Sequence, residues 1–137
     1  MGAEAYRSRK RYIYALVFKH DKSCYIGQSV NPKRRLQQHL GPKGGWNISY
    51  LDMIVLHEFQ GTKEQGEHLE YAYRLKAHRR GWKIYGLPHV YINPKKRATF
   101  AHFKTSLTLP WPKAMGSRRL WWLWSVVPLG AIALYML

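Results

Sequence analysis

Two strand-like runs joined by a short polar turn constrain the fold of this chain more than any other feature. The runs are RYIYALVFK (11–19) and SCYIGQS (23–29). Both are rich in aromatic and β-branched residues, which favour strands. The residues between them, His20, Asp21 and Lys22, suit a tight turn. The segment therefore predicts a β-hairpin.

Helix signals follow the hairpin directly. Asn31 is a favourable N-cap, and Pro32 suits the first helical position. Gly41 is a natural end to a helix, so a helix is expected over about 32–40. The glycine-rich run GPKGGWNIS (41–49) then predicts a loop.

A third strand and a second helix come next. YLDMIVLHEF (50–59) has strand character. Thr62 with Gln65 three residues later has the spacing of a capping box, which marks a helix start. This second helix is expected to run to about Arg80 and to end at Gly81.

The rest of the chain gives weaker signals. Residues 82–113 are basic, aromatic and interrupted by proline, so we expect a short strand or loop at 89–93 and irregular chain after it. The order β-β-α-β-α predicts an α/β (α+β) fold, with a small mixed three-stranded antiparallel sheet flanked by helices. The expected organisation is a basic N-terminal arm (1–10), a folded domain (11–100), a basic linker (101–119) and a hydrophobic tail (120–137).

The charge of the chain indicates a polyanionic partner. There are 23 Lys and Arg against 7 Asp and Glu, which gives a formal net charge of +16. Such an excess favours nucleic acid first and an acidic membrane surface second. A merely soluble or ribosome-associated basic protein is the plainer alternative. The single cysteine, Cys24, excludes an internal disulfide and a thiolate zinc site, and it is expected to be buried in a strand.

The few acids are clustered. Glu58, Glu64, Glu67 and Glu70 fall within thirteen positions. Carboxylates near phosphates are useful only if a cation lies between them, so the cluster indicates either a metal site or a solvated helix face.

The last eighteen residues, LWWLWSVVPLGAIALYML, carry no charge and follow Arg118 and Arg119. As a helix they would span about 27 Å, against roughly 30 Å for a bilayer core. They predict a hydrophobic C-terminal helix that is a candidate membrane anchor, with a cytoplasmic domain tethered to the inner face of the membrane. The alternative is a helix packed on the domain or on a partner.

The motifs together resemble the GIY-YIG nuclease family. YIYALV and, after it, CYIGQSVNPKRRLQQH carry the resemblance, with Tyr25, Ile26 and Gly27 as the YIG element. LEYAYR (69–74) resembles the helix that carries the metal-binding glutamate of the flap-cutting, structure-specific branch. Tyr12 stands where the family has the first glycine, and the single cysteine is not expected to build the zinc-binding domain of that branch.

The resemblance implies a metal-dependent DNA endonuclease with five catalytic residues, Tyr14, Tyr25, Arg35, His39 and Glu70. It implies that Glu70 binds Mg²⁺ or Mn²⁺. Arg35 and His39, four apart on one helical face, have the side chains to grip a phosphate and to carry a proton. Tyr14 is the favoured base, relayed through His39, although His39 and Tyr25 are also candidates. A non-catalytic nucleic-acid-binding protein on the same fold is the alternative.

Further residues are expected to serve the substrate or the fold. Gly27 is expected to permit a bend or a close backbone approach. Aromatic residues that could stack on unpaired bases, or simply pack, are Trp46, Trp82 and Tyr85. The candidates for DNA-backbone contacts are Lys33, Arg34, Lys43, Arg79, Arg80, Lys95, Lys96 and Arg97.

Overall fold

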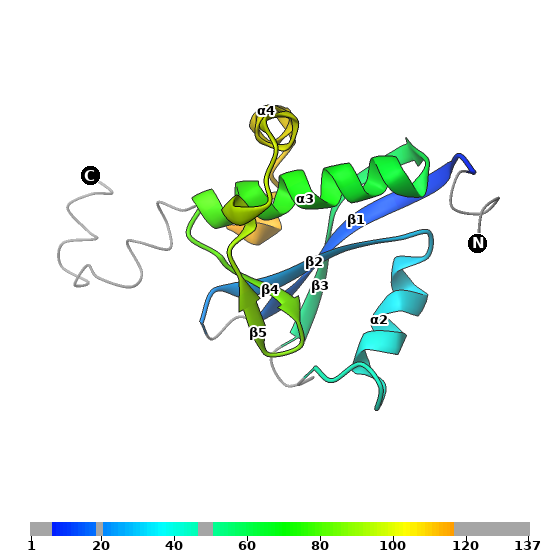
Figure 1. Ribbon diagram of the computed structural model, residues 1–137. Helices are drawn as coiled ribbons and strands as arrows, with labels where there is room; N and C mark the ends of the chain where they lie inside the picture. The colour runs from blue at the N-terminus through cyan, green and yellow to red at the C-terminus, as the bar shows by residue number, and fades with distance from the viewer. Residues whose placement is uncertain (1–6, 19–20, 47–50, 117–137) are drawn as a thin grey trace, which may run out of the picture.

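A five-stranded mixed sheet organises the part of the chain that the computed structural model describes, residues 7–18, 21–46 and 51–116 (Figure 1). The spatial order of the strands is β3-β1-β2-β4-β5. β1 is antiparallel to both β2 and β3, whereas β4 is parallel to β2 and antiparallel to β5. The strands are β1 (Arg9–Phe18), β2 (Ser23–Ser29), β3 (Leu51–Gly61), β4 (Lys83–Leu87) and β5 (Val90–Ile92). The helices are α2 (Pro32–Leu40), α3 (Lys63–Arg79) and α4 (Phe100–Thr108), with short 3-10 turns η2 (Pro94–Lys96) and η3 (Lys113–Met115).

The predicted hairpin and both predicted helices are confirmed, together with their caps. The Asn31 side chain accepts a hydrogen bond from the backbone N–H of Arg34 at 3.1 Å, and Gly41 ends α2. At the start of α3, Thr62 and Gln65 form the reciprocal capping box. These caps satisfy backbone donors that the first turn of a helix leaves free.

The expectation of a three-stranded antiparallel sheet was wrong. β4 and β5 extend the sheet to five strands and make it mixed. β4 has only five residues and contains Gly86, so its sequence carries little strand pattern. Its place is set by parallel pairing with β2, a long-range contact with no local signature.

The expectation of irregular chain beyond residue 93 was also wrong, because α4 spans Phe100–Thr108. Its N-terminus is a capping box in which His102 takes the place usually held by Glu or Gln. The backbone N–H of Thr99 donates to Nδ1 of His102 at 3.1 Å, and the Thr99 hydroxyl accepts from the His102 N–H at 3.2 Å. A search for the usual Ser/Thr-x-x-Glu/Gln pattern misses this start.

The helices α2 and α3 lie on opposite faces of the sheet (Figure 1). Alternate residues of β1 point to opposite sides. Ile13, Ala15 and Val17 pack in a core with α3, whereas Tyr14, Leu16 and Phe18 pack in a second cluster that Leu36 of α2 adjoins. Cys24 is buried in the first core, as expected. Trp46, Trp82 and Tyr85 are also buried, so they pack rather than offering open faces for bases.

Several predictions concern residues outside the described part of the chain. They include most of the basic arm and the whole hydrophobic tail at 120–137. Among the helices that the structure does describe, none is both long enough and apolar enough to cross a membrane.

Candidate active site

The candidate site lies where an edge of β2 loses its neighbouring strand. β4 pairs with β2 only along residues 23–25, and the last pair is Tyr25 with Tyr85. The ladder between β4 and β5 becomes irregular directly after Tyr85, at Gly86. Bulges of this kind bend a strand and end its pairing. Within the part of the chain that the structure describes, residues 26–29 of β2 therefore have no partner strand on this side.

Residues from α2 and from α3 line one cavity at this open edge. This cavity of about 380 Å³ is lined from both sides, so it joins residues far apart in the chain. Four of the five predicted catalytic residues line it, namely Tyr14, Tyr25, Arg35 and Glu70. The other lining residues are Gly27, Gln28, Lys63, Glu67, Tyr71 and Arg74.

Gly27 makes room for the phenol of Tyr14. The two residues are cross-strand partners, so the Tyr14 ring lies over Gly27. A Cβ atom on Gly27 would lie 2.7 Å from Tyr14 Oη and 2.9 Å from Cζ. The sequence suggested a bend or a close approach of backbone at Gly27, but the close approach is made by a side chain.

Replacing Gly27 by Ala should therefore destabilise the protein by about 1–3 kcal/mol, because the added methyl group overpacks the buried Tyr14 ring. It should also reduce cleavage by displacing the phenol. Urea unfolding and a cleavage assay would measure the two effects. Gly41→Ala is the matched control for stability, since a Cβ there would have its nearest contact at 3.4 Å. Wild-type stability in Gly27→Ala would contradict this account.

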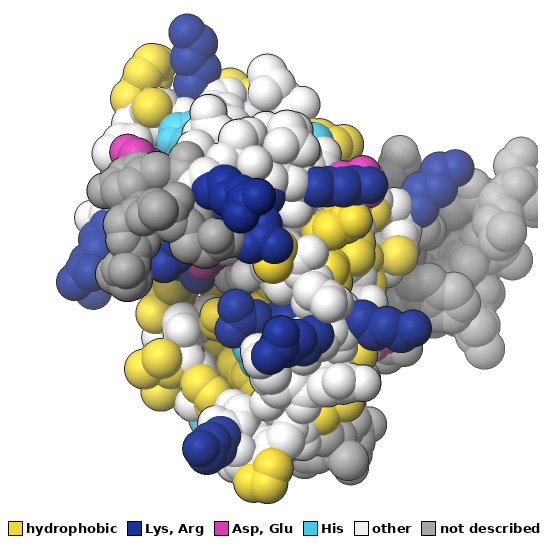
Figure 2. Space-filling model, turned by 90° about the vertical axis from the view of Figure 1, so that its right-hand side faces the viewer, with side chains coloured by type: hydrophobic (Ala, Val, Ile, Leu, Met, Phe, Trp, Pro, Cys, Tyr) yellow, Lys and Arg dark blue, Asp and Glu magenta, His cyan; other side chains and the backbone are white. Residues whose placement is uncertain are grey.

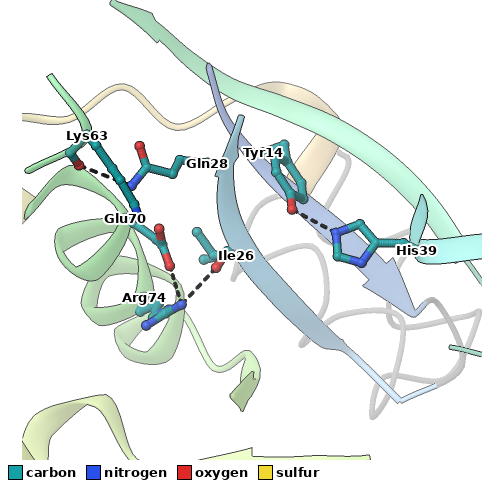
Figure 3. Close-up of polar contacts among 7 residues, drawn as sticks. All are labelled: Tyr14, Ile26, Gln28, His39, Lys63, Glu70 and Arg74. Carbon is teal, nitrogen blue, oxygen red and sulfur yellow. Dashed lines mark hydrogen bonds and ion pairs between the residues drawn. The ribbon is translucent and has the colours of Figure 1, made fainter. Parts of the chain in front are cut away.

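Tyr14 is coupled to His39, the fifth predicted residue. Tyr14 Oη lies 2.8 Å from His39 Nε2, and the two face one another in Figure 3. Tyr25 lies beside both, with ring centroids 6.5 Å from Tyr14 and 5.6 Å from His39. Tyr14 and His39 are thus placed to share a proton.

The protonation states of this pair follow from burial. Burial raises the pKa of the Tyr14 phenol far above its usual value, with Tyr25 adding to the effect and Arg35 opposing it. Burial, followed by the nearby Arg35 guanidinium, lowers the pKa of His39. Desolvation therefore outweighs the opposing influence of the Arg35 and Arg74 guanidinium groups on the pKa of Tyr14. At neutral pH the phenol is therefore protonated and the imidazole neutral, and the phenol donates to Nε2 in the tautomer that carries its hydrogen on Nδ1.

Glu70 contributes a largely buried carboxylate from α3. Its side chain is 16 % exposed and forms an ion pair with Arg74, one helical turn later (Figure 3). Burial raises the pKa of Glu70, and Arg74 is the strongest influence in the opposite direction. Glu67 also raises this pKa, whereas the Gln28 amide and Arg35 lower it.

The donor set suits a hard divalent cation held mainly by substrate and water. Glu70 is a buried carboxylate in the cavity, and Glu67 is an exposed one at its rim. The buried Oε1 of Gln28 has no hydrogen-bond partner within the described residues. Residues 7–18, 21–46 and 51–116 contain no group of three or more His, Cys, Asp or Glu that could hold a metal. Mg²⁺ commonly binds through one or two carboxylates together with substrate phosphates.

A larger groove adjoins the cavity and shares Tyr25 and Arg35 with it. Its volume is about 670 Å³. Its lining surface is mainly apolar and also includes the basic side chains of Arg35 and Lys43. The remaining lining residues are Gln38, His39, Gly41, Pro42, Lys43, Gly44, Trp46 and Pro88.

The predicted DNA-backbone residues fall into separate regions. Lys33, Arg34 and Lys43 are exposed on α2 and the loop after it. Figure 2 shows the side of the molecule that carries α2, where Lys and Arg are spread widely and few acidic side chains are visible. Lys95, Lys96 and Arg97 are exposed in and after η2.

Arg79 and Arg80 lie at the other end of α3, where they contact the C-terminal part of the fold. Arg79 Nη1 donates to Ser106 Oγ at 3.0 Å, and Arg80 lies 5.0 Å over the Trp111 ring. Both residues therefore have packing roles, which sequence alone did not indicate.

Sequence reasoning missed four residues that line the cavity: Gln28, Lys63, Tyr71 and Arg74. The i to i+4 spacing of Glu70 and Arg74 was a usable signal for one of them. Gln28 gave no such signal, because its role depends on how β2 sits against α3. The Gln28 amide donates to the Lys63 carbonyl at 3.2 Å, and its Oε1 lies so close to Gly66 that a Cβ there would be 1.9 Å away.

Comparison with known proteins agrees with this geometry. The family model described as the GIY-YIG catalytic domain matches residues 10–84, more than half of the chain. The protein therefore belongs to the GIY-YIG family, whose domain implies nuclease-type activity on DNA. No curated protein and no solved structure shows detectable similarity to the chain.

Proposed function

We propose that this protein is a metal-dependent endonuclease that hydrolyses DNA phosphodiester bonds at the cavity beside β2. One observation carries the proposal. Three side chains from separate elements line one small cavity: the Glu70 carboxylate of α3, the Arg35 guanidinium of α2 and the Tyr14 phenol of β1. His39 is hydrogen-bonded to that phenol. Such a set can hold a cation, stabilise charge on a phosphate and move a proton.

The proton route begins at the attacking water. Tyr14 Oη accepts a proton from that water as it passes its own proton to His39 Nε2, 2.8 Å away. The high pKa of the phenol favours this concerted transfer, because a free tyrosinate would be costly in the buried site. The resulting hydroxide attacks phosphorus, the bond from phosphorus to the leaving sugar oxygen breaks, and that oxygen takes up a proton from solvent water.

Charge on the phosphoryl group would be balanced from two sides. The exposed Arg35 guanidinium can donate two parallel hydrogen bonds to phosphate oxygens. Glu70 would hold Mg²⁺ or Mn²⁺, and the cation would supply positive charge to the phosphate oxygens when bound. A bound substrate completes the ligand set, so metal affinity should be weak without DNA.

The adjoining groove supports structure-specific cleavage. Continuous duplex presents charged backbone to a protein surface, whereas an unpaired nucleotide also presents an apolar base. The mainly apolar groove shares Tyr25 and Arg35 with the cavity, so it is suited to a base next to the scissile phosphate. We therefore propose that branched or flapped DNA is the preferred substrate.

A panel of end-labelled oligonucleotides in Mg²⁺ would test the activity and the preference together. Flaps, a four-way junction and a nicked duplex should be cut at least about tenfold faster than continuous duplex, since unstacking a base costs a few kcal/mol. Equal rates on all substrates would refute structure specificity. Binding without cleavage of any substrate, in Mg²⁺ or Mn²⁺, would favour the alternative of a non-catalytic nucleic-acid-binding protein.

A further inference from the structure

We propose that Arg74 is a positioning residue: it fixes one carboxylate oxygen of Glu70 and leaves the other oxygen to face a divalent cation. This inference rests on the proposed metal-dependent function. It concerns a residue that does not itself need to contact the substrate, and it follows from how Arg74 joins α3 to the open edge of β2 (Figure 3).

One nitrogen of Arg74 makes both contacts. Nη2 donates to the carbonyl oxygen of Ile26 at 3.1 Å and also to Oε1 of Glu70. Ile26 is the first residue of β2 beyond its pairing with β4. The backbone of the sheet therefore fixes the guanidinium, and the guanidinium in turn fixes the carboxylate.

The arrangement limits how Glu70 can move. Its side chain and that of Arg74 are each 16 % exposed, so neither can easily leave the other for solvent. The Gln28 amide lines the cavity from β2 and lowers the pKa of Glu70, which favours the charged carboxylate. A carboxylate held in this way keeps one orientation toward the cavity before any cation arrives.

Stability of the fold alone does not account for Arg74. A buried ion pair is weak evidence for stability, because desolvation offsets much of the attraction. Moreover, Nε of Arg74 is buried without a hydrogen-bond partner within the described residues, and such a donor is destabilising. The guanidinium thus keeps its hydrogen bonds to Glu70 and Ile26, although this position leaves its own Nε without a partner among the described residues. Mutation of a residue that hydrogen-bonds a metal-ligating carboxylate typically lowers metal affinity or activity by about 10–100-fold.

The test compares Arg74→Met and Arg74→Lys with the wild-type chain. Arg74→Met should raise the Mg²⁺ concentration for half-maximal cleavage by about 10–100-fold. Arg74→Lys should recover only part of this, since a single ammonium lacks the planar fork of the guanidinium. Lys104→Met, an exposed change on α4 away from the cavity, is the matched control and should match the wild type.

A second measurement follows the metal directly. Mn²⁺ binding is measured by electron paramagnetic resonance with DNA bound, in a Tyr14→Phe background that suppresses cleavage. Arg74→Met should weaken this binding in parallel with the kinetic shift. If Arg74→Met does not fold, as thermal unfolding would show, Arg74→Gln replaces it because its amide can still donate to the Ile26 carbonyl.

Failure of this inference is distinguishable from failure of the proposed function. A folded Arg74 variant with wild-type Mg²⁺ dependence and wild-type Mn²⁺ affinity would overturn the role of Arg74, even if the wild type cuts DNA well. A wild-type chain that cuts no DNA would overturn the proposed function, and the Mn²⁺ titration would still decide the role of Arg74.

Discussion

Glu70→Gln should abolish cleavage, with a loss of about 1,000-fold or more, while the chain stays folded and still binds DNA. The amide has nearly the same shape as the carboxylate but lacks the charge that attracts a divalent cation. Burial already favours the neutral form of Glu70, which is why its pKa is raised, so the substitution should cost little stability. Single-turnover cleavage in Mg²⁺, thermal unfolding and DNA binding measure the three properties.

Glu64→Gln is the matched control for this variant. Glu64 is an exposed acid in the first turn of α3, and it does not line the cavity. It should behave like the wild type. If Glu70→Gln cut DNA at the wild-type rate, the metal-binding role of Glu70 would have to be abandoned.

Tyr14→Phe should lower the single-turnover rate by about 10²–10⁴-fold, the usual contribution of general acid–base catalysis. The variant keeps the ring that packs over Gly27 but removes the oxygen that lies 2.8 Å from His39 Nε2. Folding should therefore be preserved while the proton route is lost. Tyr12→Phe, in the same strand but away from the cavity, is the control. A full rate in Tyr14→Phe would exclude the phenol as the proton acceptor.

The pH dependence of the wild type gives this second prediction a further readout. His39 accepts a proton only when it is neutral, and the neutral form predominates above its pKa. Because burial and Arg35 lower that pKa, activity should persist below the usual histidine value of 6.5 and fall only as the pH drops through the lowered value. In His39→Gln, the remaining activity should lack this acidic limb. If the acidic limb of the pH profile is unchanged in His39→Gln, that limb belongs to the titration of another group.

The parts of the fold that could be predicted from sequence are those with local signals. The caps at Asn31 and Thr62 lie within a few residues of what they stabilise, so the sequence alone locates α2 and α3. β4 depends on pairing with a distant strand, and α4 begins with a histidine in a capping role that usually belongs to Glu or Gln. β4 therefore has no short-range pattern, and the short-range pattern at the start of α4 is not one that usually marks a helix.

The same distinction applies to the site. The positions of Tyr14, Tyr25, Arg35 and Glu70 could be chosen from motif spacing, and the structure brings them to one cavity. Their catalytic roles stay predictions until variants are measured. Arg74 could be chosen only as an ion-pair partner of Glu70, from their i to i+4 spacing, whereas Gln28 could not be chosen because its role depends on how β2 sits against α3.

The irregularity of β4 has a consequence for which changes the protein can tolerate. Gly86 follows the last residue that pairs with β2, and a Cβ there would lie 2.6 Å from Cγ2 of Ile92. A side chain at position 86 would therefore press on Ile92 and displace the hairpin that lies next to the open edge of β2. Gly86 and Ile92 carry no reactive group and do not line the cavity, yet the shape of the strand edge beside the reaction centre depends on both.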